Sequence, residues 1–367
     1  LSDGETVVDI DGSTEPTLDI RAGTTAFGQP GIIGSTDSLS NFPDTEGIAT
    51  SADINIQNIT NNGGLVFLTN QNQPNSNLSG EITIGSIDTS SNLGGGNVFI
   101  DSRDGITVNS LINVSGGDIA NFDFSGNGGK ISLLANHEII INSGSLISSS
   151  GLLGGNINLK SKGDIFITGS TIQNASFTTS PRMTGGDINI TANTLSIAED
   201  SRLFTTTFGG ANSGNIIFNV NETTSLEGFN TFIITQVQPK AIGNGGDLRI
   251  ETQNLFIDEA VIGVDTYGNG NAGDVTIKAE QFRISQGGQI NTRTFSNGNT
   301  GNLTVESQSV EVIGRTFDNS NPTGLFVRVE AQEAIGNGGD LTIKTENLLV
   351  AEGAKISATT FGVGNAG

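Results

Sequence analysis

The side chains that could catalyse a reaction are few, and they are scattered along the 367-residue sequence. The single histidine, His137, stands in a short polar segment between two apolar stretches, where we expect a surface turn. Cysteine is absent, which excludes thiol nucleophiles, cysteine-ligated metals and disulfides. No serine stands in a Gly-x-Ser-x-Gly motif, the pattern that presents a nucleophile on a sharp strand-to-helix turn.

Carboxylate pairs are the second candidate for catalysis. Asp9, Asp11 and Glu15 are close in sequence, and Asp258 precedes Glu259. Some parallel β-helices cleave acidic polysaccharides with clustered Asp or Glu and a basic residue. Here the carboxylates are spread along the chain, and outward, solvated positions explain both groups. We therefore assign no catalytic residue and expect a protein that is not an enzyme.

Glycine-rich segments could bind a metal ion or a phosphate. Asn244-Gly245-Gly246-Asp247 and Asn337-Gly338-Gly339-Asp340 resemble the Ca²⁺-binding nonapeptides of repeats-in-toxin proteins, but the nine-residue period is missing. Equivalent positions hold Lys130, Asn156 and Asn215, which supply no carboxylate. The segments also precede strands rather than helices, which excludes a phosphate loop. We assign no metal-binding or cofactor-binding residue, and adventitious or structural calcium stays open.

The charge balance limits the partners. The chain has 16 Lys and Arg against 38 Asp and Glu, a net charge of −22. Such a surface repels phosphate backbones and anionic lipids, so we expect no nucleic-acid partner. No apolar run reaches the ~20 residues that a transmembrane helix needs.

A repeat of about thirty residues organises the chain from residue 97 onwards. Each copy has a glycine followed by an anchor residue and an apolar-x-apolar triplet, and the anchors are Asn97, Lys130, Asn156, Asp187, Asn215, Asp247, Asp274, Asn302 and Asp340. Val275 and Ile277 show the pattern, which has the period of two of a strand with one buried face. A second apolar pair such as Leu348 and Val350 follows, and a third strand begins near positions such as Ile356.

Three short strands per copy without a helical connection predict an all-β fold, a right-handed parallel β-helix (β-solenoid) of about twelve coils. We expect residues 97–367 to form the repeat β-helix, as part of a longer array. Residues 1–96 are less regular, and we expect irregular coils on the same axis, with a distinct N-terminal β region as the alternative. Residues 225–241 and 314–324 are expected to be protruding loops.

Corner residues carry two further expectations. The glycine before each anchor suits a corner with φ > 0. Stacked Asn and Asp side chains are expected to hydrogen-bond to one another along the axis, as in amide ladders.

The end of the coil has its own signature. Four aromatic residues each follow a Thr and precede an Asn by four positions and a Gly by six: Phe208, Tyr267, Phe295 and Phe361. Thr205-x-Thr207 and Thr292-x-Thr294 resemble the Thr rows of ice-binding solenoids, but the register is not sustained. We expect ordinary exposed strand positions there.

The repeat resembles that of a known protein family. The segment 337–362, NGGDLTIKTENLLVAEGAKISATTFG, resembles the repeats of filamentous-haemagglutinin-like exoproteins, in particular the large cyanobacterial members of two-partner secretion systems. The resemblance covers residues 97–367 well and residues 1–96 weakly. It implies a right-handed β-helical passenger that an outer-membrane two-partner-secretion transporter exports. It also implies display on the surface of a diderm bacterium, or release, as an adhesin.

Two functions follow as hypotheses. The first is an extracellular structural or adhesive shaft for cell-surface attachment, aggregation, or sheath or filament formation. Its partners would be a cell-surface or extracellular polysaccharide or a protein ligand, with lateral self-association also open. The alternative is a carbohydrate-active β-helix that binds or cleaves an extracellular polysaccharide. Several carboxylates and a base converging in one groove would favour the alternative.

Overall fold

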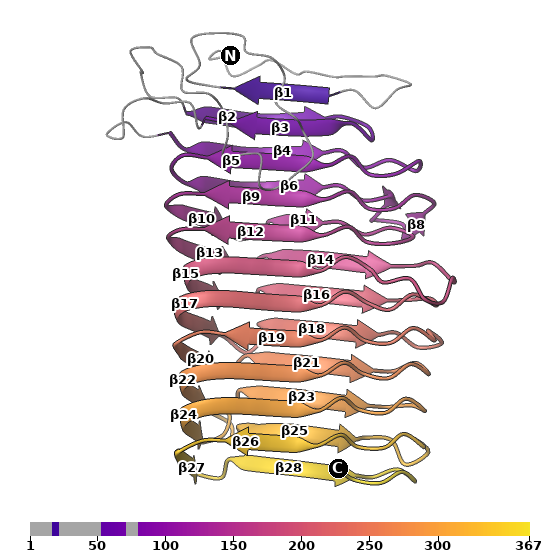
Figure 1. Ribbon diagram of the computed structural model, residues 1–367, viewed down its shortest axis with the longest axis vertical. Coiled ribbons are helices and arrows are strands. Elements are labelled where there is room, and N and C mark those ends of the chain that lie inside the picture. Colours follow the sequence, from indigo (N-terminus) through magenta and orange to yellow (C-terminus); the bar gives the residue numbers. More distant parts are fainter. Residues whose placement is uncertain (1–16, 22–52, 71–79) are drawn as a thin grey trace.

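The chain winds into a stack of parallel coils (Figure 1). The structure is a computed structural model that describes residues 17–21, 53–70 and 80–367. All of its regular elements in that part of the chain are strands, and 26 of them join one continuous hydrogen-bonded network. The predicted all-β parallel β-helix is confirmed. The coil count was overestimated, since the structure has about ten turns. Dividing the whole chain by a thirty-residue period ignored longer coils and counted residues outside the described part.

Each coil contributes strands to three parallel sheets. The first sheet consists of β1 (Thr17–Arg21), β3 (Leu65–Thr69), β5 (Val98–Ser102), β9 (Ile131–Ala135), β12 (Ile157–Ser161), β19 (Leu248–Glu251), β26 (Leu341–Lys344) and the first halves of β15 (Ile188–Ala198), β17 (Ile216–Glu227), β22 (Val275–Ser285) and β24 (Leu303–Ile313). The second halves of those four long strands continue into the second sheet, with β10 (Glu138–Ile141), β13 (Asp164–Thr168), β20 (Asn254–Asp258), β27 (Asn347–Ala351) and the first halves of β2 (Ile54–Thr60), β4 (Ile82–Asp88) and β6 (Ile106–Asn113).

The third sheet bears on function. It begins with the ends of β2, β4 and β6 and continues through β11 (Leu146–Ser148), β14 (Thr171–Ser176), β16 (Arg202–Thr207), β18 (Phe232–Val237), β21 (Val261–Thr266), β23 (Gln289–Thr294), β25 (Gly324–Val329) and β28 (Lys355–Thr360). After each third-sheet strand the chain extends into a narrow tip and returns to the next first-sheet strand (Figure 1).

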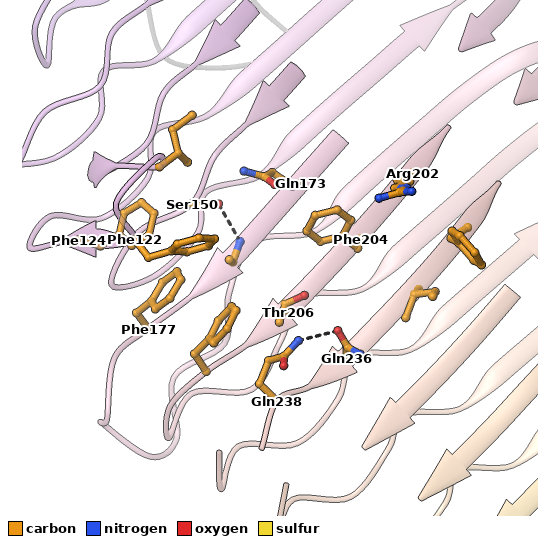
Figure 2. A pocket seen from close by; sticks show the side chains of 15 residues that line it. Phe122, Phe124, Ser150, Gln173, Phe177, Arg202, Phe204, Thr206, Gln236 and Gln238 are labelled. Atoms are coloured by element: carbon orange, nitrogen blue, oxygen red, sulfur yellow. Dashed lines mark hydrogen bonds between the residues drawn. The ribbon is translucent and has the colours of Figure 1, made fainter. Parts of the chain in front are cut away.

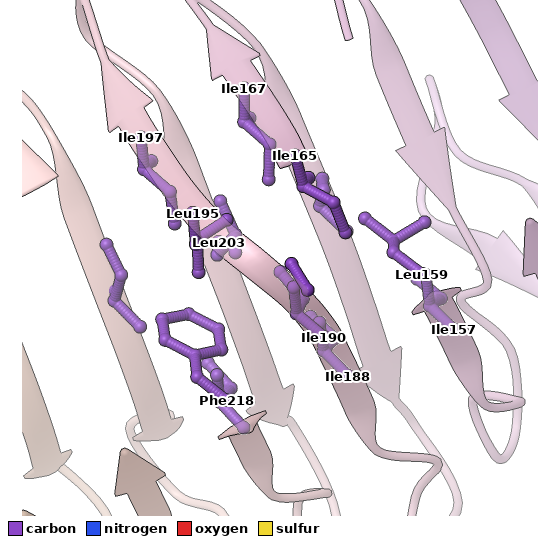
Figure 3. Close-up of a cluster of buried hydrophobic side chains, with 14 of the residues drawn as sticks. Ile157, Leu159, Ile165, Ile167, Ile188, Ile190, Leu195, Ile197, Leu203 and Phe218 are labelled. Atoms are coloured by element: carbon purple, nitrogen blue, oxygen red, sulfur yellow. The ribbon is translucent and has the colours of Figure 1, made fainter. Parts of the chain in front are cut away.

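Apolar side chains at equivalent positions lie over one another along the axis. Leu248 pairs with Val275, and Val275 pairs with Leu303, all in parallel register and all fully buried. Figure 3 shows the same stacking among side chains of β12, β13, β15, β16 and β17. Because one coil presents only a thin apolar edge, each coil needs its neighbours to bury it. The inward assignment of the repeat is confirmed.

The described strands before residue 97 continue this stack. β1 pairs with β3 and β3 with β5, while β2 pairs with β4 and β4 with β6. The division at residues 96 and 97 itself stays a prediction. Asp9, Asp11 and Glu15 lie outside the described residues.

The expectation of a loop over residues 225–241 is wrong. That segment contains the end of β17 and all of β18, and Leu226 faces the core, paired with Ile257. Its weak apolar pattern obscured the strand, because Thr224 occupies an inward position that is usually apolar. Residues 315–323, between β24 and β25, do form a loop, and Phe317 at its tip is exposed.

The glycine before each anchor is needed for close contact between coils and not for positive φ. A Cβ atom on Gly246 would lie 1.9 Å from the carbonyl oxygen of Gly214, and a Cβ atom on Gly214 would lie 1.8 Å from that of Gly186. Positive φ occurs instead at the turns between the second and third sheets, for example at Gln286 (φ 50°) and Gly287 (φ 90°), and at a few tip residues such as Lys240 (φ 72°). The expectation of φ > 0 at the anchor corner was therefore wrong.

The anchor side chains form an axial ladder, but the main chain supplies most of the donors. The Asp247 amide donates to Asn215 Oδ1 at 2.8 Å, and the Asp274 amide donates to Asp247 Oδ1 at 2.9 Å. A second ladder joins Asn244, Asn271 and Asn299 in the same manner. Side-chain oxygens are thus the main acceptors for amides of the next coil. The expected side-chain-to-side-chain bonds occur at some steps, for example from Asn302 Nδ2 to Asp274 Oδ1 at 3.2 Å.

The Thr-x-Thr pairs face inwards. Thr205 and Thr207 are fully buried at the end of β16, and Thr205 Oγ1 donates to the Gly214 carbonyl at 2.6 Å. Thr292 and Thr294 are buried at the equivalent positions. These pairs form no exposed row, so the expectation of exposed strand positions was wrong.

Candidate functional site

The outward side chains of the third sheet form a surface that we call the aromatic face. The main chain pairs residue by residue along the axis, so outward side chains line up in columns. The outermost column follows the strand ends and contains Phe177, Phe208, Gln238, Tyr267, Phe295, Glu330 and Phe361. Inner columns add Phe204 and Phe232, and also Phe326, which is fully buried beneath Arg328.

Aromatic rings of this outermost column stack in consecutive coils. The centroids of Phe177 and Phe208 are 4.5 Å apart with ring planes at 6°, and Tyr267 and Phe295 have the same separation and angle. These separations match the ~4.8 Å spacing of parallel strands, so the strand register itself places the rings in contact. Gln238 separates the two stacks.

A surface groove of about 440 Å³ lies on the N-terminal half of the aromatic face (Figure 2). Its floor consists of alternate residues of β14, β16 and β18: Gln173, Ala175, Phe204, Thr206, Ile234 and Gln236. Phe177, Phe208 and Gln238 form one side, and Arg202 and Phe232 form the other. The groove therefore runs along the helix axis between two columns of side chains.

A short hairpin closes one end of the groove. β7 (Gly117–Asp118) and β8 (Asp123–Phe124) pair antiparallel in an insertion between β6 and β9. Phe124 stacks on Phe177 with ring centroids 4.5 Å apart, so it extends the Phe177–Phe208 stack by one ring. Phe122 packs at 6.3 Å from Phe177 and is 66% exposed. The hairpin thus places an exposed ring at the rim of the groove.

The polar groups of the groove are mostly neutral. Gln238 Nε2 donates to Gln236 Oε1 at 2.6 Å, and Gln173 Nε2 donates to Ser148 Oγ at 3.1 Å. Among the described residues that line the groove, Arg202 is the one charged residue, and none is a carboxylate. Its guanidinium lies 5.9 Å from the Phe232 ring centroid. This set of groups suits binding through stacking and hydrogen bonds, and it lacks an acid–base pair.

Beyond the groove the aromatic face carries a charged cluster. Arg293 donates to both carboxylate oxygens of Asp265, at 2.9 and 2.7 Å. The guanidinium of Arg328 stacks 3.6 Å from the Phe326 ring centroid. Burial lowers the pKa of Arg328, partly offset by Glu330. Burial also acts against the charge of Arg293, but its hydrogen bonds to Asp265 and the charge of that carboxylate outweigh burial and raise its pKa.

Tyr267 stands beside that cluster. Burial raises the pKa of the Tyr267 phenol, and the negative charge of Asp265 raises it further. The phenol is therefore neutral over the whole physiological range and acts as a hydrogen-bonding and stacking group.

The candidate catalytic residues of the sequence do not reach the groove. His137 lies in an exposed turn between β9 and β10, as expected, with Nδ1 2.5 Å from Asp104 Oδ1. Asp258 ends β20, where it accepts hydrogen bonds from Ser285 and Gln286, and Glu259 follows in the turn. The structure therefore does not bring His137 to the Asp258–Glu259 pair, and none of the three lines the groove.

The groove itself was not found from the sequence. Phe208 and Tyr267 were recognised as the signature of a coil end, but their outward direction was not used. Inward and outward residues alternate along each third-sheet strand. This alternation places Phe204 on the same side as Phe208, and Phe232 on the same side as Gln238, so it could have identified both as outward. The hairpin with Phe122 has no counterpart in other copies, so the repeat gives no signal for it.

Comparison with known proteins finds no matching family model, no matching curated protein and no matching solved structure. Within residues 17–21, 53–70 and 80–367, no group of three or more His, Asp or Glu side chains could hold a metal ion. No helix of that same part is long and apolar enough to span a membrane. The groove is therefore the feature on which a functional proposal can rest.

Proposed function

We propose that the chain is an extracellular β-helical shaft that mediates attachment or aggregation of cells through its aromatic face. The parallel coils supply a stiff scaffold, because each coil is hydrogen-bonded and packed on both neighbours. The observation that carries the proposal is the groove with aromatic walls and amide groups, which presents a preformed binding surface on that scaffold. Many shafts on one cell would multiply such weak contacts into avidity.

Binding is favoured over cleavage. Glycoside hydrolysis uses a pair of carboxylates, or an equivalent acid and base, close to the scissile bond. The described residues around the groove offer amides, hydroxyls, aromatic rings and Arg202 instead. We therefore propose that the chain is not an enzyme. Of the carbohydrate-active alternative, we keep polysaccharide binding and not polysaccharide cleavage.

We further propose that the chain is secreted or displayed on the surface of a diderm bacterium. The support is the resemblance of its repeats to filamentous-haemagglutinin-like exoproteins, whose partner is an outer-membrane two-partner-secretion transporter. Lateral association of shafts into sheaths or filaments would be compatible with this proposal.

Deletion of the gene in the source bacterium tests the proposal. Antibody against the chain should label intact parent cells, and the deletion strain should lose aggregation or attachment. A complementing gene with Phe208→Ala should restore the label but not the full attachment, whereas one with Phe256→Ala should restore both. Phe256 is a suitable control since it is an outward, partly exposed ring on the second sheet, away from the groove. Labelling that requires permeabilised cells would contradict surface display, and turnover of an acidic polysaccharide by the purified chain would favour the enzyme.

A further inference from the structure

We infer that the groove of the aromatic face binds a segment of a linear, uncharged polysaccharide that lies parallel to the helix axis. The inference deepens the proposed function, because it names the chemical class of the ligand for the same surface. It rests on four observations: the charge of the lining, the pairing of aromatic and amide groups, the state of the strand edges, and the direction of the walls.

The charges exclude a polyanion as the preferred ligand. Arg202 is the one cation among the described lining residues, and it already faces the Phe232 ring. The chain as a whole has a net charge of −22, which repels an acidic polymer before it reaches the groove. A polycation would meet no carboxylate among the lining residues. An uncharged ligand is therefore the one that fits.

The lining combines two kinds of groups that a sugar ring needs together. The C–H faces of a pyranose are apolar and pack on aromatic rings such as Phe204 and Phe208. Its hydroxyls both donate and accept hydrogen bonds, as do the amides of Gln173 and Gln236. A purely apolar ligand would leave the remaining donors and acceptors of these amides unsatisfied, which costs free energy.

A peptide that adds as an extra strand is excluded by the pairing of the sheet. β16 pairs with β14 on one side and with β18 on the other, and β18 pairs on with β21. Their main-chain groups are thus used within the sheet, and the groove offers side chains alone. Strand addition requires a free edge, which this part of the third sheet does not have.

The walls set the direction of the ligand. Phe124, Phe177 and Phe208 stack along the axis on one side, and Arg202 and Phe232 follow the axis on the other. In the next coil Gly263 stands at the position of Ile234, and the Asp265 carboxylate lies against it, held by Arg293, so the floor of the groove ends at this ion pair. The two walls therefore hold a linear chain parallel to the axis, over β14, β16 and β18.

Calorimetric titration of the purified chain tests the inference. The probes are cellohexaose, laminarihexaose, maltohexaose and mannohexaose, with hexagalacturonic acid as the acidic counterpart and an unstructured apolar peptide as the peptide counterpart. We expect at least one uncharged hexasaccharide to bind more tightly than the acidic one and the peptide. Phe208→Ala should weaken that binding about tenfold, and Gln236→Leu by a similar factor.

The matched control is Phe256→Ala, which removes a ring of similar exposure, 37% against 40% for Phe208, from a different sheet. It should change the affinity less than about twofold, and all variants should melt like the parent. The inference would be overturned if none of the uncharged sugars bound, or if the acidic sugar or the peptide bound more tightly. It would also be overturned if Phe208→Ala and Phe256→Ala lost the same affinity. If the inference failed in this way but deletion of the gene still abolished cell attachment, the proposed adhesive function would be retained. If the purified chain bound the sugar but was not displayed on the cell surface, the inference would be retained and the proposed adhesive function would be rejected.

Discussion

Asp265 and Arg293 occupy the same position in consecutive coils and form a two-point ion pair on the outer side of the third sheet. Arg293 Nε lies 2.9 Å from Asp265 Oδ1, and Nη2 lies 2.7 Å from Oδ2. The Asp265 side chain is 2% exposed although it points away from the core, because its neighbours on the aromatic face cover it. Planar, two-point pairs of this kind are the strongest that a guanidinium makes.

Removing the carboxylate should destabilise the coils around β21 and β23. Asp265→Ala leaves the largely covered Arg293 without its partner, and we expect a loss of about 3 kcal/mol in the free energy of unfolding. Urea denaturation followed by circular dichroism measures it. The double variant Asp265→Ala with Arg293→Met should recover most of the loss, since no unpaired charge remains. Equal stability of the single and double variants would show that the ion pair does not hold this part of the face together.

Alkaline pH should weaken the fold through Tyr267, the only tyrosine in the sequence. Burial, followed by the charge of Asp265, raises its pKa in the folded state above the ordinary value of 10.0. The folded state therefore binds the phenolic proton more tightly than the unfolded state. This contribution to stability is complete below the unfolded pKa and is lost as pH rises through the folded pKa.

The tyrosinate absorbance of the native protein reports this titration directly. Its midpoint should lie above 10.0, and Asp265→Asn should bring it closer to the ordinary value. Tyr267→Phe should lack the alkaline loss of stability, apart from that of other groups. A native midpoint at or below the ordinary value would contradict the burial of the phenol.

The glycine column between coils should not tolerate a methyl group. A Cβ atom on Gly246 would meet the Gly214 carbonyl oxygen at 1.9 Å, so Gly246→Ala must push two coils apart. We expect a loss of about 2–3 kcal/mol. Gly263→Ala is the control, because the nearest atom to its added Cβ is a carboxylate oxygen of Asp265 at 3.6 Å. Similar melting temperatures for both variants would refute the close-contact role of the column.

Charge in the stacked core should be far more damaging than the same charge one residue away. Ile277 is fully buried between Ile250 and Val305, and Ile277→Asp should cost at least about 4 kcal/mol. Thr276→Asp, on the outward side of the same strand, should cost little. Ile343→Asp should also destabilise the stack, since Ile343 pairs with Val305 at the same inward position. Hydrogen exchange in the neighbouring coils would locate the damage, and equal protection in the Ile277 and Thr276 variants would reverse the inward assignment.

The sequence was most informative where one physical requirement repeats. Pairs such as Val275 and Ile277 alternate with outward residues in every copy, so strand, inward face and coil register all follow from one pattern. The same pattern missed the strands within residues 225–241. Directly before that segment, Thr224 occupies an inward position that is apolar in other coils. Buried Thr205 and Thr207 looked exposed for a similar reason, because their hydroxyls find carbonyl partners inside the tip.

The sequence by itself determined the parallel β-helix, because a thin apolar edge that recurs every coil can be buried only by stacking. It also supplied the residues of the aromatic face, but not their association. Only the tertiary structure decided that Phe124 from the inserted hairpin stacks on Phe177, and that Arg202, Gln236 and Phe208 border one groove. These associations join residues of different coils, and their geometry depends on the exact register of one coil on the next.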